Sequence, residues 1–455
     1  MNYTLKLSGY QHAALQSHLL QDANEAAAIV LCGRCVTDSQ TILIGQKVVP
    51  IPLEACVVRH PDFLHWRTDA VEAAFEEAAS KGLSVLKIHS HPGGYADFSR
   101  TDDASDKELF PSLYGWTDGP HASAVMLPDG SIFGRHVSDK GRFTPIRRVA
   151  VAGDDVRIWD HETHIGEVPT TANRHARAFG AATTLLLKRL KIAVVGCSGT
   201  GSVVIEQLGR LQVGELILID PDCAEDVNSN RIIGLTAEDV ECRRPKVEVL
   251  KRSVEAMGLG TRVTALPRDV MNPDAIKAVA ECDLVFGCMD SASGRHVLNK
   301  LAATYCLPYI DVGVRLVADG SGSISHVCGS VNYLQPGGSS LLSRGLYTLQ
   351  DFEAEMLKKG DPEAYKARLA EKYIKGVQES RPAVISVNTV YAGLAVTEML
   401  ARLHPFRDDP NGRYASTCLS LNGTFVECSS DGQPCPVINR HAGKGDMEPL
   451  LGLQS

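Results

Sequence analysis

Long apolar runs are missing from this sequence, and so is an excess of positive charge. No window of about 18 or more apolar residues occurs in the 455-residue chain, so we expect no segment that crosses a bilayer. The N-terminal stretch MNYTLKLSGYQHAALQSHLL has no long apolar core with a small-residue cleavage site, so it does not predict a secretory signal. The net charge of −8 argues against a general attraction to nucleic acid or to an anionic membrane.

Internal repeats and low-complexity tracts are absent as well, and the composition is that of a globular protein. Hydrophobic residues make up 44% and charged residues 22% of the chain. The length is too great for one core and predicts two or three domains. The 13 cysteines lie scattered through apolar runs such as CDLVFGC and AATYC, as reduced and buried thiols do, so we expect a cytoplasmic protein.

The first segment, residues 1–145, mixes strands with helix. Its short apolar runs bounded by turn residues predict strands at 26–32, 40–49, 83–91 and 122–128. The run DAVEAAFEEAASKG predicts a helix that ends at Gly82. Residues 146–172 carry no clear periodicity, and we assign them to a linker.

The second segment, residues 173–455, alternates strands with helices. Strands are expected at 191–196, 215–220, 262–268, 282–290 and 308–313, with helices at 201–212, 245–258 and 293–306. Alternation at this spacing predicts a parallel, doubly wound sheet. The fold class is therefore α/β, with a mixed α/β first domain and a Rossmann-like second domain.

A group of potential metal ligands follows the expected strand at 83–91. His89 and His91 are two residues apart at the end of an apolar strand, so their side chains share one face. Asp102 follows after Pro92 and two glycines that would fold the chain back in a turn. Three nitrogen and oxygen ligands with an open fourth position are the layout of a catalytic zinc site. Glu25, just before the strand at 26–32, is the best candidate for a proton acceptor that is not a ligand.

The string HSHP, followed at fixed offsets by Ser99 and Asp102 and preceded by Glu25, resembles the JAMM motif of the JAB/MPN metalloprotease family. The resemblance covers roughly residues 5–140. It implies that His89, His91 and Asp102 bind zinc, that Glu25 is the general base and acid, and that Ser99 stabilises the oxyanion. The alternative is that the two histidines are ordinary surface residues after a strand.

A glycine-rich turn joins the expected strand at 191–196 to the helix that follows. Gly196, Gly199 and Gly201 would expose backbone N–H groups that can donate to a phosphate at a helix start. Ser198 stands where the strict dinucleotide fingerprint has a glycine. Asp220 ends the next strand and could hold the ribose of NAD or of ATP, so these residues do not choose between the two.

The residues after Asp220 favour ATP. Asn228, Asn230, Arg231 and Lys246 supply amide and cationic donors that an NAD enzyme does not need. Attack of a carboxylate on an α-phosphate does need such donors, because negative charge spreads over the phosphoryl oxygens. Asp290 ends a strand at the sheet edge where such folds bind ligands, and it is well placed to hold Mg²⁺.

The order of these elements resembles the ThiF/MoeB/ubiquitin-activating superfamily over about residues 173–440. The matching elements are the glycine turn, Asp-Pro-Asp, Asn-x-Asn-Arg, Pro-Lys-Val, the strand-end aspartate with Arg295 and Asn299 following, and PYIDVG. The resemblance implies MgATP as cofactor, a homodimer, and a nucleotide site formed by Gly196, Gly199, Gly201, Asp220, Asp222, Asn228, Asn230, Arg231, Lys246 and Asp290. It also implies that Arg177, in the run RHARAFG, acts as an arginine finger on the partner subunit's ATP. The alternative is that these polar residues are solvated loop residues.

Two features of that superfamily are missing. Many relatives carry two Cys-x-x-Cys pairs for a structural zinc, and this half has none. The crossover segment, residues 341–382, holds no cysteine that could form a thioester with the activated tail. Four other cysteines could form the thioester instead: Cys328, Cys418, Cys428 and Cys435. We interpret each of them as structural, and Cys435 is the first to test for a thioester.

The two resemblances together predict a bifunctional enzyme. The second domain would adenylate the C-terminus of a ubiquitin-like protein, and the first would hydrolyse a peptide or isopeptide bond after that protein's tail. A conjugating enzyme is a further expected partner, and a bacterial source is expected. Three alternatives stay open: sulfur-carrier activation, a binding scaffold with an inactive first domain, and a Rossmann oxidoreductase.

Overall fold

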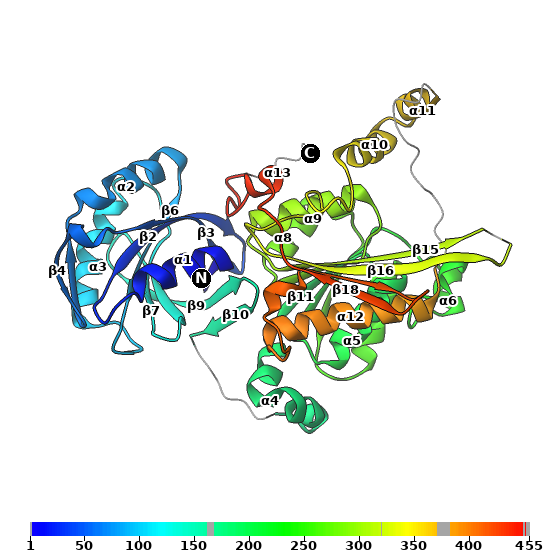
Figure 1. The fold of residues 1–455 in the computed structure, drawn as a ribbon, viewed down its shortest axis with the longest axis horizontal. Helices are drawn as coiled ribbons and strands as arrows, with labels where there is room; N and C mark the ends of the chain where they lie inside the picture. The colour runs from blue at the N-terminus through cyan, green and yellow to red at the C-terminus, as the bar shows by residue number, and fades with distance from the viewer. Residues whose placement is uncertain (1, 162–167, 320, 371–382, 449–450, 452–455) are drawn as a thin grey trace. The chain divides into compact units, whose positions relative to one another are not determined.

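The computed structural model describes residues 2–161, 168–319, 321–370, 383–448 and 451. The chain divides into two compact units, each with its own large sheet (Figure 1). The first unit comprises Met1–His164 with Ala303–Cys306 and His441–Ser455. The second comprises Ile165–Ala302 and Leu307–Arg440.

The first unit is built on a sheet with strand order β1-β3-β2-β6-β7-β8-β9-β10, in which β1 also pairs with β9. The strands are β1 (Asn2–Ser8), β2 (Ala27–Val36), β3 (Gln40–Pro50), β6 (Ser84–Ser90), β7 (His121–Met126), β8 (Ile132–Val137), β9 (Phe143–Ala152) and β10 (Val156–Asp160). A separate hairpin joins β4 (Cys56–His60) to β5 (Phe63–Trp66). The helices are η1 (Leu53–Ala55), α1 (Gly9–Leu19), α2 (Asp69–Lys81) and α3 (Arg100–Leu113).

Apolar side chains fill both faces of this sheet. Ala28 and Val30 of β2 pack in one cluster with Leu15 of α1. Their neighbours on the opposite face, such as Ile29, pack with Phe75 of α2. A strand buried on both faces reads as a continuous apolar run, which is why the sequence at 26–32 lacks alternation.

The predicted elements of the first segment are present with small shifts of their ends. The predicted helix over 69–82 is confirmed as α2, which ends where Gly82 adopts the left-handed conformation with a φ of 63°. The predicted strands correspond to β2, β3, β6 and β7.

The assignment of residues 146–172 to a linker is wrong for its first part. Residues 146–152 belong to β9 and residues 156–160 form β10. A bulge where β9 meets Tyr3 and Thr4 of β1 breaks the alternation, so the buried residues of β9 are Ile146 and then Val149, Val151 and Ala152. This irregular spacing hid the strand. The later residues of the assigned linker include 162–167, which lie outside the described residues.

The C-terminal residues from His441 belong to the first unit, whereas the sequence analysis assigned them to the second domain. Gly445 forms a parallel bridge with Arg34 at the end of β2, and the backbone N–H of Asp446 donates to Arg34 O at 2.7 Å. A side chain on Gly33 would overlap the backbone of Gly443, so the two segments approach this closely only with glycine at position 33. No local pattern in the sequence predicts such a long-range contact.

The second unit has strand order β13-β12-β11-β14-β15-β16-β17-β18. The strands from β13 to β15 pair in parallel and those from β15 to β18 in antiparallel fashion. Their bounds are β11 (Lys191–Val195), β12 (Glu215–Ile219), β13 (Arg262–Leu266), β14 (Leu284–Gly287), β15 (Tyr309–Ala318), β16 (Ile324–Leu334), β17 (Ser416–Ser420) and β18 (Phe425–Ser429). The predicted fold class is confirmed, and the antiparallel extension is what the sequence analysis did not foresee.

Helices connect and cover these strands (Figure 1). They are η2 (Thr170–Ala172), α4 (Asn173–Leu187), α5 (Gly199–Arg210), η3 (Asp226–Asn228), α6 (Ala237–Glu241), α7 (Lys246–Ala256), α8 (Pro273–Ala280), α9 (Ala292–Thr304), α10 (Leu349–Gly360), α11 (Pro362–Ala370), α12 (Ile385–Leu403), η4 (Asn411–Tyr414) and α13 (Pro436–Asn439). Among the described residues, no helix combines the length and the apolar character that crossing a membrane requires.

The strand order reverses direction next to β11. The chain runs from β11 outward through β12 to β13, then returns to place β14 on the other side of β11. Ligands of open α/β sheets bind at such a switch point, at the carboxyl ends of the strands. The helices that begin there are α5 and α9.

Candidate functional site

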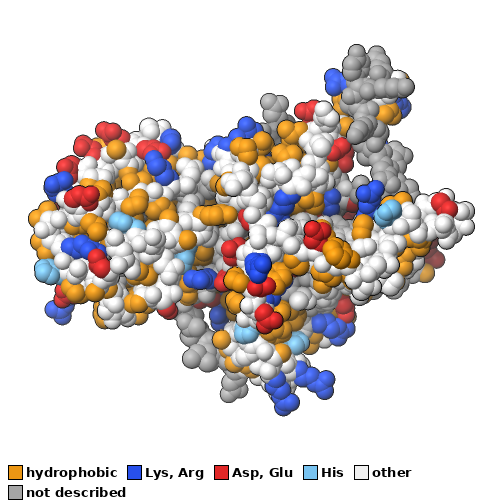
Figure 2. Space-filling view, in the orientation of Figure 1, with side chains coloured by type: hydrophobic (Ala, Val, Ile, Leu, Met, Phe, Trp, Pro, Cys, Tyr) orange, Lys and Arg blue, Asp and Glu red, His pale blue; other side chains and the backbone are white. Residues whose placement is uncertain are grey.

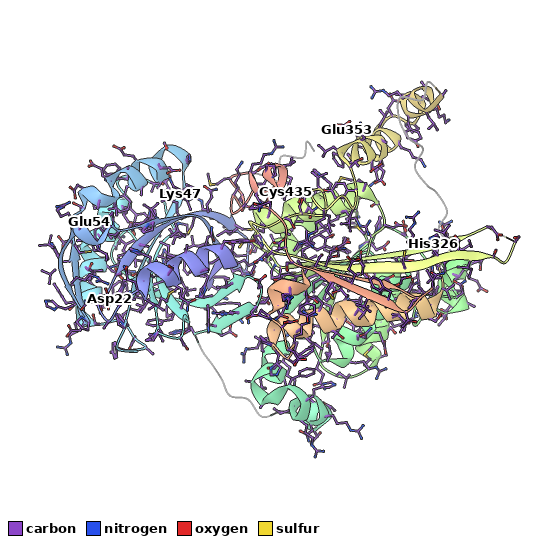
Figure 3. All side chains as sticks on the ribbon, in the orientation of Figure 1. Asp22, Lys47, Glu54, His326, Glu353 and Cys435 are labelled. Atoms are coloured by element: carbon purple, nitrogen blue, oxygen red, sulfur yellow. The ribbon has the colours of Figure 1, made fainter. Side chains whose placement is uncertain are left out.

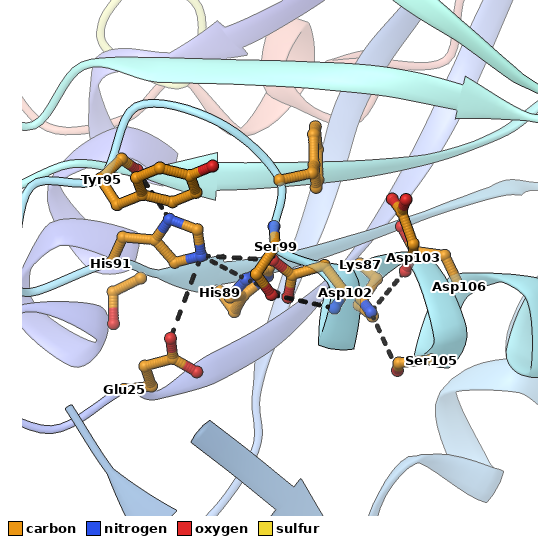
Figure 4. A network of polar contacts seen from close by, with 12 residues as sticks. Glu25, Lys87, His89, His91, Tyr95, Ser99, Asp102, Asp103, Ser105 and Asp106 are labelled. Atoms are coloured by element: carbon orange, nitrogen blue, oxygen red, sulfur yellow. Dashed lines mark hydrogen bonds and ion pairs between the residues drawn. The ribbon is translucent and has the colours of Figure 1, made fainter. Parts of the chain in front are cut away.

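The two histidines at the end of β6 turn the same ring nitrogen toward each other (Figure 4). His89 Nε2 and His91 Nε2 lie 3.1 Å apart. The oxygens of Asp102 lie 3.0 Å from His89 Nε2 and 3.5 Å from His91 Nε2. All three side chains are buried.

These distances fit a tetrahedral metal ion. An ion with ligand bonds of about 2.0–2.1 Å holds its ligand atoms roughly 3.3–3.4 Å apart. The three separations of 3.0, 3.1 and 3.5 Å lie close to that value. Two imidazoles and one carboxylate leave a fourth position open, as catalytic zinc requires. The donor set therefore fits zinc.

Asp102 is held by the start of a helix rather than by the turn that the sequence analysis expected. Ser99 is the N-cap of α3, and its Oγ accepts from the backbone N–H of Asp102 at 3.1 Å. In return Asp102 Oδ2 accepts from the backbone N–H of Ser99 at 2.7 Å. This capping box fixes the carboxylate. Ser99 Oγ accepts from this N–H, and its hydroxyl also interacts with the Asp102 carboxylate, which helps to lower the pKa of that carboxyl.

Glu25 lies on the open side of this group, just before β2. Its Oε1 is 3.9 Å from His91 Nε2, farther than either oxygen of Asp102. Burial raises the pKa of Glu25 to about 7. The ligand atoms of Glu25, His89 and His91 lie within 4.8 Å of one another, so Glu25 could itself reach a metal ion. Asp102 is the better ligand because it contacts both imidazoles, which leaves Glu25 as the neighbour of the fourth position.

Hydrogen bonds set the protonation of the site. His91 Nδ1 donates to the carbonyl of Tyr95 at 2.7 Å, which leaves the lone pair of Nε2 for a metal ion. Burial raises the pKa of Asp102, but its contacts with the imidazoles of His89 and His91 outweigh that effect and hold the pKa far below its usual range. Burial lowers the pKa of His89. The sequence analysis missed Tyr95, because a carbonyl contact leaves no mark on residue type.

A buried ion network lies one helical turn beyond Asp102. Asp106 pairs with Lys87 of β6 and, at 2.7 Å, with Arg135 of β8. The Arg135 guanidinium lies 3.7 Å from the ring centres of Phe98 and Phe143. Residues four apart share a helix face, so this network anchors the same face of α3 that carries Asp102.

The β4–β5 hairpin holds the segment that carries Glu25. Arg59 Nε donates to the carbonyl of Glu25 at 2.8 Å, and its two Nη atoms bind Asp22 at 2.7 and 2.8 Å. The backbone N–H of Glu25 donates to His60 O at 3.0 Å. Arg59 is thus a positioning residue that fixes the backbone on both sides of Asn24.

Replacing Arg59 with Ala should slow any hydrolysis at this site by about 10- to 100-fold, because the Glu25 carboxylate loses its fixed position. Lysine should restore little, since it cannot form the paired contact with Asp22. The effect should fall on kcat at unchanged zinc content. Arg67→Ala is the control, because its pair with Asp69 is exposed. A loss of bound zinc that matches the loss of activity in Arg59→Ala would contradict a positioning role.

In the second unit, the glycine turn follows β11 at the switch point. Gly196 has a φ of 91°, and a side chain on Gly201 would overlap the Gly196 carbonyl. Asp220, at the end of β12, accepts from the backbone N–H of Cys197 at 2.7 Å and of Asp222 at 2.9 Å. A carboxylate has about four acceptor positions, so Asp220 can still bind ribose hydroxyls. Burial raises its pKa.

The remaining predicted nucleotide residues take different orientations. Lys246 Nζ binds Asp222 at 2.7 Å, close to Asp220. Asn228 is buried and its Oδ1 accepts from the backbone N–H of Glu225 at 3.2 Å, which leaves only its NH₂ group for a phosphate. Arg231 donates to the carbonyl of Val227.

Three other predicted residues are exposed. Asn230 Oδ1 accepts weakly from Arg231 at 3.4 Å. Asp290 follows β14 and faces solvent. Arg177 is exposed on α4, where basic side chains gather in the space-filling view (Figure 2).

Arg295, one of the elements of the resemblance, belongs to a buried polar group whose contacts the sequence did not predict. Arg295 Nε donates to Asp311 at 3.1 Å, and Tyr309 OH donates to the same oxygen at 3.2 Å. Glu355 of α10 accepts from the backbone N–H groups of Ala292 and Ser293 at 3.0 and 2.7 Å. The described part of the crossover segment is therefore tied to the start of α9, two residues after Asp290.

The four candidate cysteines lie in two places. Cys328, Cys418 and Cys428 are on β16, β17 and β18. Cys435 is 1% exposed and directly precedes α13 (Figure 3). Burial raises its pKa, but hydrogen bonds from Ser340 and from the backbone N–H groups of the α13 turn outweigh it and lower the pKa. The described crossover helices are α10 and α11, and residues 371–382 lie outside the described residues.

Comparison with known proteins gives the family. The model of the ThiF family matches residues 172–437, which is more than half of the chain. The chain belongs to the ThiF family. The model of prokaryotic homologs of the JAB domain matches residues 8–136. The predicted resemblance to both families is confirmed.

Relatives of this ThiF-family chain share only part of its length. The adenylyltransferase and sulfurtransferase UBA4 of Meyerozyma guilliermondii is 29% identical over 147 residues, which cover 32% of this chain and 34% of that protein. The sulfur carrier protein adenylyltransferase of Thermus thermophilus is 29% identical over 140 residues, 31% of this chain and 51% of that protein. The ubiquitin-like modifier-activating enzyme 5 of Drosophila persimilis is 28% identical over 158 residues, 32% of this chain and 38% of that protein. The chain thus spans about a third to a half of these relatives' length.

Among solved structures, E. coli MccB with ATP has 19% sequence identity and a TM-score of 0.44. That comparison covers 61% of this chain and 75% of MccB.

Proposed function

We propose that this chain adenylates the C-terminus of a ubiquitin-like or sulfur-carrier protein with MgATP and hydrolyses a peptide or isopeptide bond after that protein's tail. The observation that carries the proposal is the presence of two sites in one chain. One is the convergence of His89, His91 and Asp102, and the other is the glycine turn that Asp220 ties at the switch point of a ThiF-type sheet.

In the adenylation reaction, a terminal carboxylate oxygen of the carrier bonds to the α-phosphorus as the bond to pyrophosphate breaks. Asp220 holds the ribose, and the first turn of α5 offers its N–H groups to phosphate. Arg231, Lys246, Asn228 and Asn230 neutralise or bind the phosphoryl oxygens. A magnesium ion held at Asp290 would offset the charge of the triphosphate. Asp222 orients Lys246 through their ion pair.

In the hydrolytic reaction, water adds to the carbonyl carbon after the carrier's tail, and the amine leaves. A zinc ion on His89, His91 and Asp102 would lower the pKa of the water to near neutral. Glu25 takes the proton from the water and gives it to the departing amine. The Ser99 hydroxyl donates to the carbonyl oxygen as negative charge develops there.

Sulfur-carrier chemistry is the second candidate. The sequence 341–382 has no cysteine to accept the activated tail as a thioester, and two of the relatives above are named for sulfur transfer or sulfur carriers. In that case the adenylate passes to sulfide or a thiol. The buried, clustered Glu25, His89, His91 and Asp102 speak against an inactive scaffold, and the ThiF family match speaks against an oxidoreductase.

The assembly of the protein belongs to the same proposal. Exposed Arg177 would reach the ATP of a partner subunit, which makes a homodimer the expected form. A separate conjugating enzyme would accept the tail if the product is a conjugate. A cytoplasmic location fits the free cysteines, and a bacterial source remains part of the proposal.

The test is incubation of the full chain with MgATP and a small carrier protein that ends in Gly-Gly. Carrier-dependent exchange of pyrophosphate into ATP is expected, because adenylate formation is reversible. Mass spectrometry of the carrier separates the products: adenylate alone, a thiocarboxylate with added sulfide, or a thioester on this chain. Tight binding of a nicotinamide cofactor, without exchange, would sink the proposal for the second unit.

A further inference from the structure

A buried amide side chain lies at the first turn of α5, and no predicted role accounts for it. Asn388 sits in the first turn of α12 and is 4% exposed. It lies far beyond Gly199 in the sequence, and only the fold brings it to the glycine turn. Its neighbours in the run AVISVNTVYA are mostly apolar, and Asn388 itself carries no visible motif.

The amide packs directly against Gly199. A side chain at Gly199 would overlap Asn388 Nδ2, and its Cβ would lie 3.2 Å from Arg231 Cδ. Glycine at position 199 therefore leaves the room that the amide occupies. Asn388 and Arg231 approach the same point, the first residue of α5, from two different elements.

Among the described residues, the start of α5 has no side-chain cap and the Asn388 amide has no hydrogen-bond partner. Ser198, the N-cap of the 12-residue helix α5, makes no side-chain cap hydrogen bond. Within the described ranges, no hydrogen bond to the side-chain amide of Asn388 is found, although the residue is buried. Neither polar atom of this amide is among the side-chain atoms that are shielded from water without a partner, so an external acceptor can reach it. An acceptor supplied from outside the chain would satisfy the amide and the helix start together.

We propose that Asn388 is a further nucleotide-binding residue, which donates from Nδ2 to an oxygen of the α-phosphate of ATP. The helix N-terminus supplies backbone N–H groups to the same phosphate, and Arg231 supplies positive charge beside it. A neutral donor suits this position. It binds the phosphate oxygen but, unlike a cationic side chain, it does not also bind the incoming carboxylate. The proposal rests on the proposed use of ATP and adds a residue to that site.

The opposing interpretation is that Asn388 only fills space against Gly199. A packing role would affect every ligand of the second unit alike and would respond to side-chain volume. A phosphate-binding role responds to charge and only in ligands that carry phosphate. Adenosine and MgATP share the base and ribose, so the pair of ligands separates the two interpretations.

The experiment measures calorimetric binding of MgATP and of adenosine to the full chain and to Asn388→Asp. This variant keeps the shape of the side chain and replaces a donor by an anion. We expect MgATP to bind about 10- to 100-fold more weakly, the effect of losing a hydrogen bond to a charged group, and adenosine to bind as in the parent. Ser386→Asp is the matched control, because it adds the same charge at an exposed position of the same helix turn.

Asn388→Ala provides the second variant, should the aspartate prevent folding. Asn388→Ala should also weaken the binding of MgATP and not that of adenosine, and the loss should be smaller than in Asn388→Asp. Unchanged MgATP affinity in a folded variant, or an equal loss for MgATP and adenosine, would overturn the proposal. Failure of the parent chain to bind MgATP at all is a different result, since it would overturn the proposed adenylation function itself.

Discussion

Replacing Glu25 with Gln is expected to lower the rate of tail hydrolysis by about 10²- to 10⁴-fold, the range for loss of a general base. Glutamine keeps the size of the side chain but cannot accept the proton of the attacking water. The substrate is a carrier protein with extra residues after its C-terminal glycine, and the product is measured by mass spectrometry. Zinc content should stay at about one per chain, because His89, His91 and Asp102 are the ligands.

Two controls make the Glu25 result specific. Glu54→Gln removes an exposed carboxylate from the same unit and should leave the rate unchanged (Figure 3). Removal of the metal with a chelator should abolish hydrolysis, and added zinc should restore it. Loss of zinc in Glu25→Gln would instead make Glu25 a ligand. That outcome would contradict its assignment as the base, although the three side chains could still form a metal site.

Replacing Asp290 with Ala is expected to reduce carrier-dependent pyrophosphate exchange by about 10²-fold or more, because the triphosphate loses its magnesium ligand and the charge in the transition state is no longer offset. Asp290 follows β14 at the switch point and is exposed, so its removal should not unfold the second unit. Hydrolysis by the first unit should be unaffected.

Asp274→Ala is the matched control for Asp290, since Asp274 is an exposed aspartate in the first turn of α8. Exchange should continue in that variant at the parental rate. Raising the magnesium concentration should partly rescue Asp290→Ala if the lost contact is to the metal. Full activity of Asp290→Ala would contradict the assignment and would move the magnesium site elsewhere.

The two proposed reactions oppose each other, because one would activate the carrier's tail and the other would cut after it. A cell gains from such a fusion if the hydrolytic unit first trims the carrier and the adenylating unit then activates the new C-terminus. The same hydrolysis could later release the carrier from its acceptor. Comparison of a trimmed and an extended carrier in the exchange assay would separate these orders, since only a trimmed tail presents a free terminal glycine.

Local sequence was sufficient to predict many of the helices and strands of this protein and most of its candidate metal site. The helix that ends at Gly82 and the alternation of strands and helices after residue 190 follow from short-range periodicity and turn chemistry. The His89, His91, Ser99 and Asp102 group was also visible, because its members lie within one strand, one turn and one helix start. Spacing along the chain nearly fixes such residues in space.

Tertiary structure decided the rest, because it joins residues that no local pattern connects. Arg59 contacts Glu25 from a hairpin. Asn388 contacts Gly199 from a helix that comes late in the sequence of the second unit. The pairing of Gly445 with Arg34 assigned the C-terminal residues to the first unit. A bulge concealed β9, since an extra residue destroys the two-residue period that identifies a strand. Contacts of this kind depend on packing between distant segments, and packing leaves no periodic signal in the sequence.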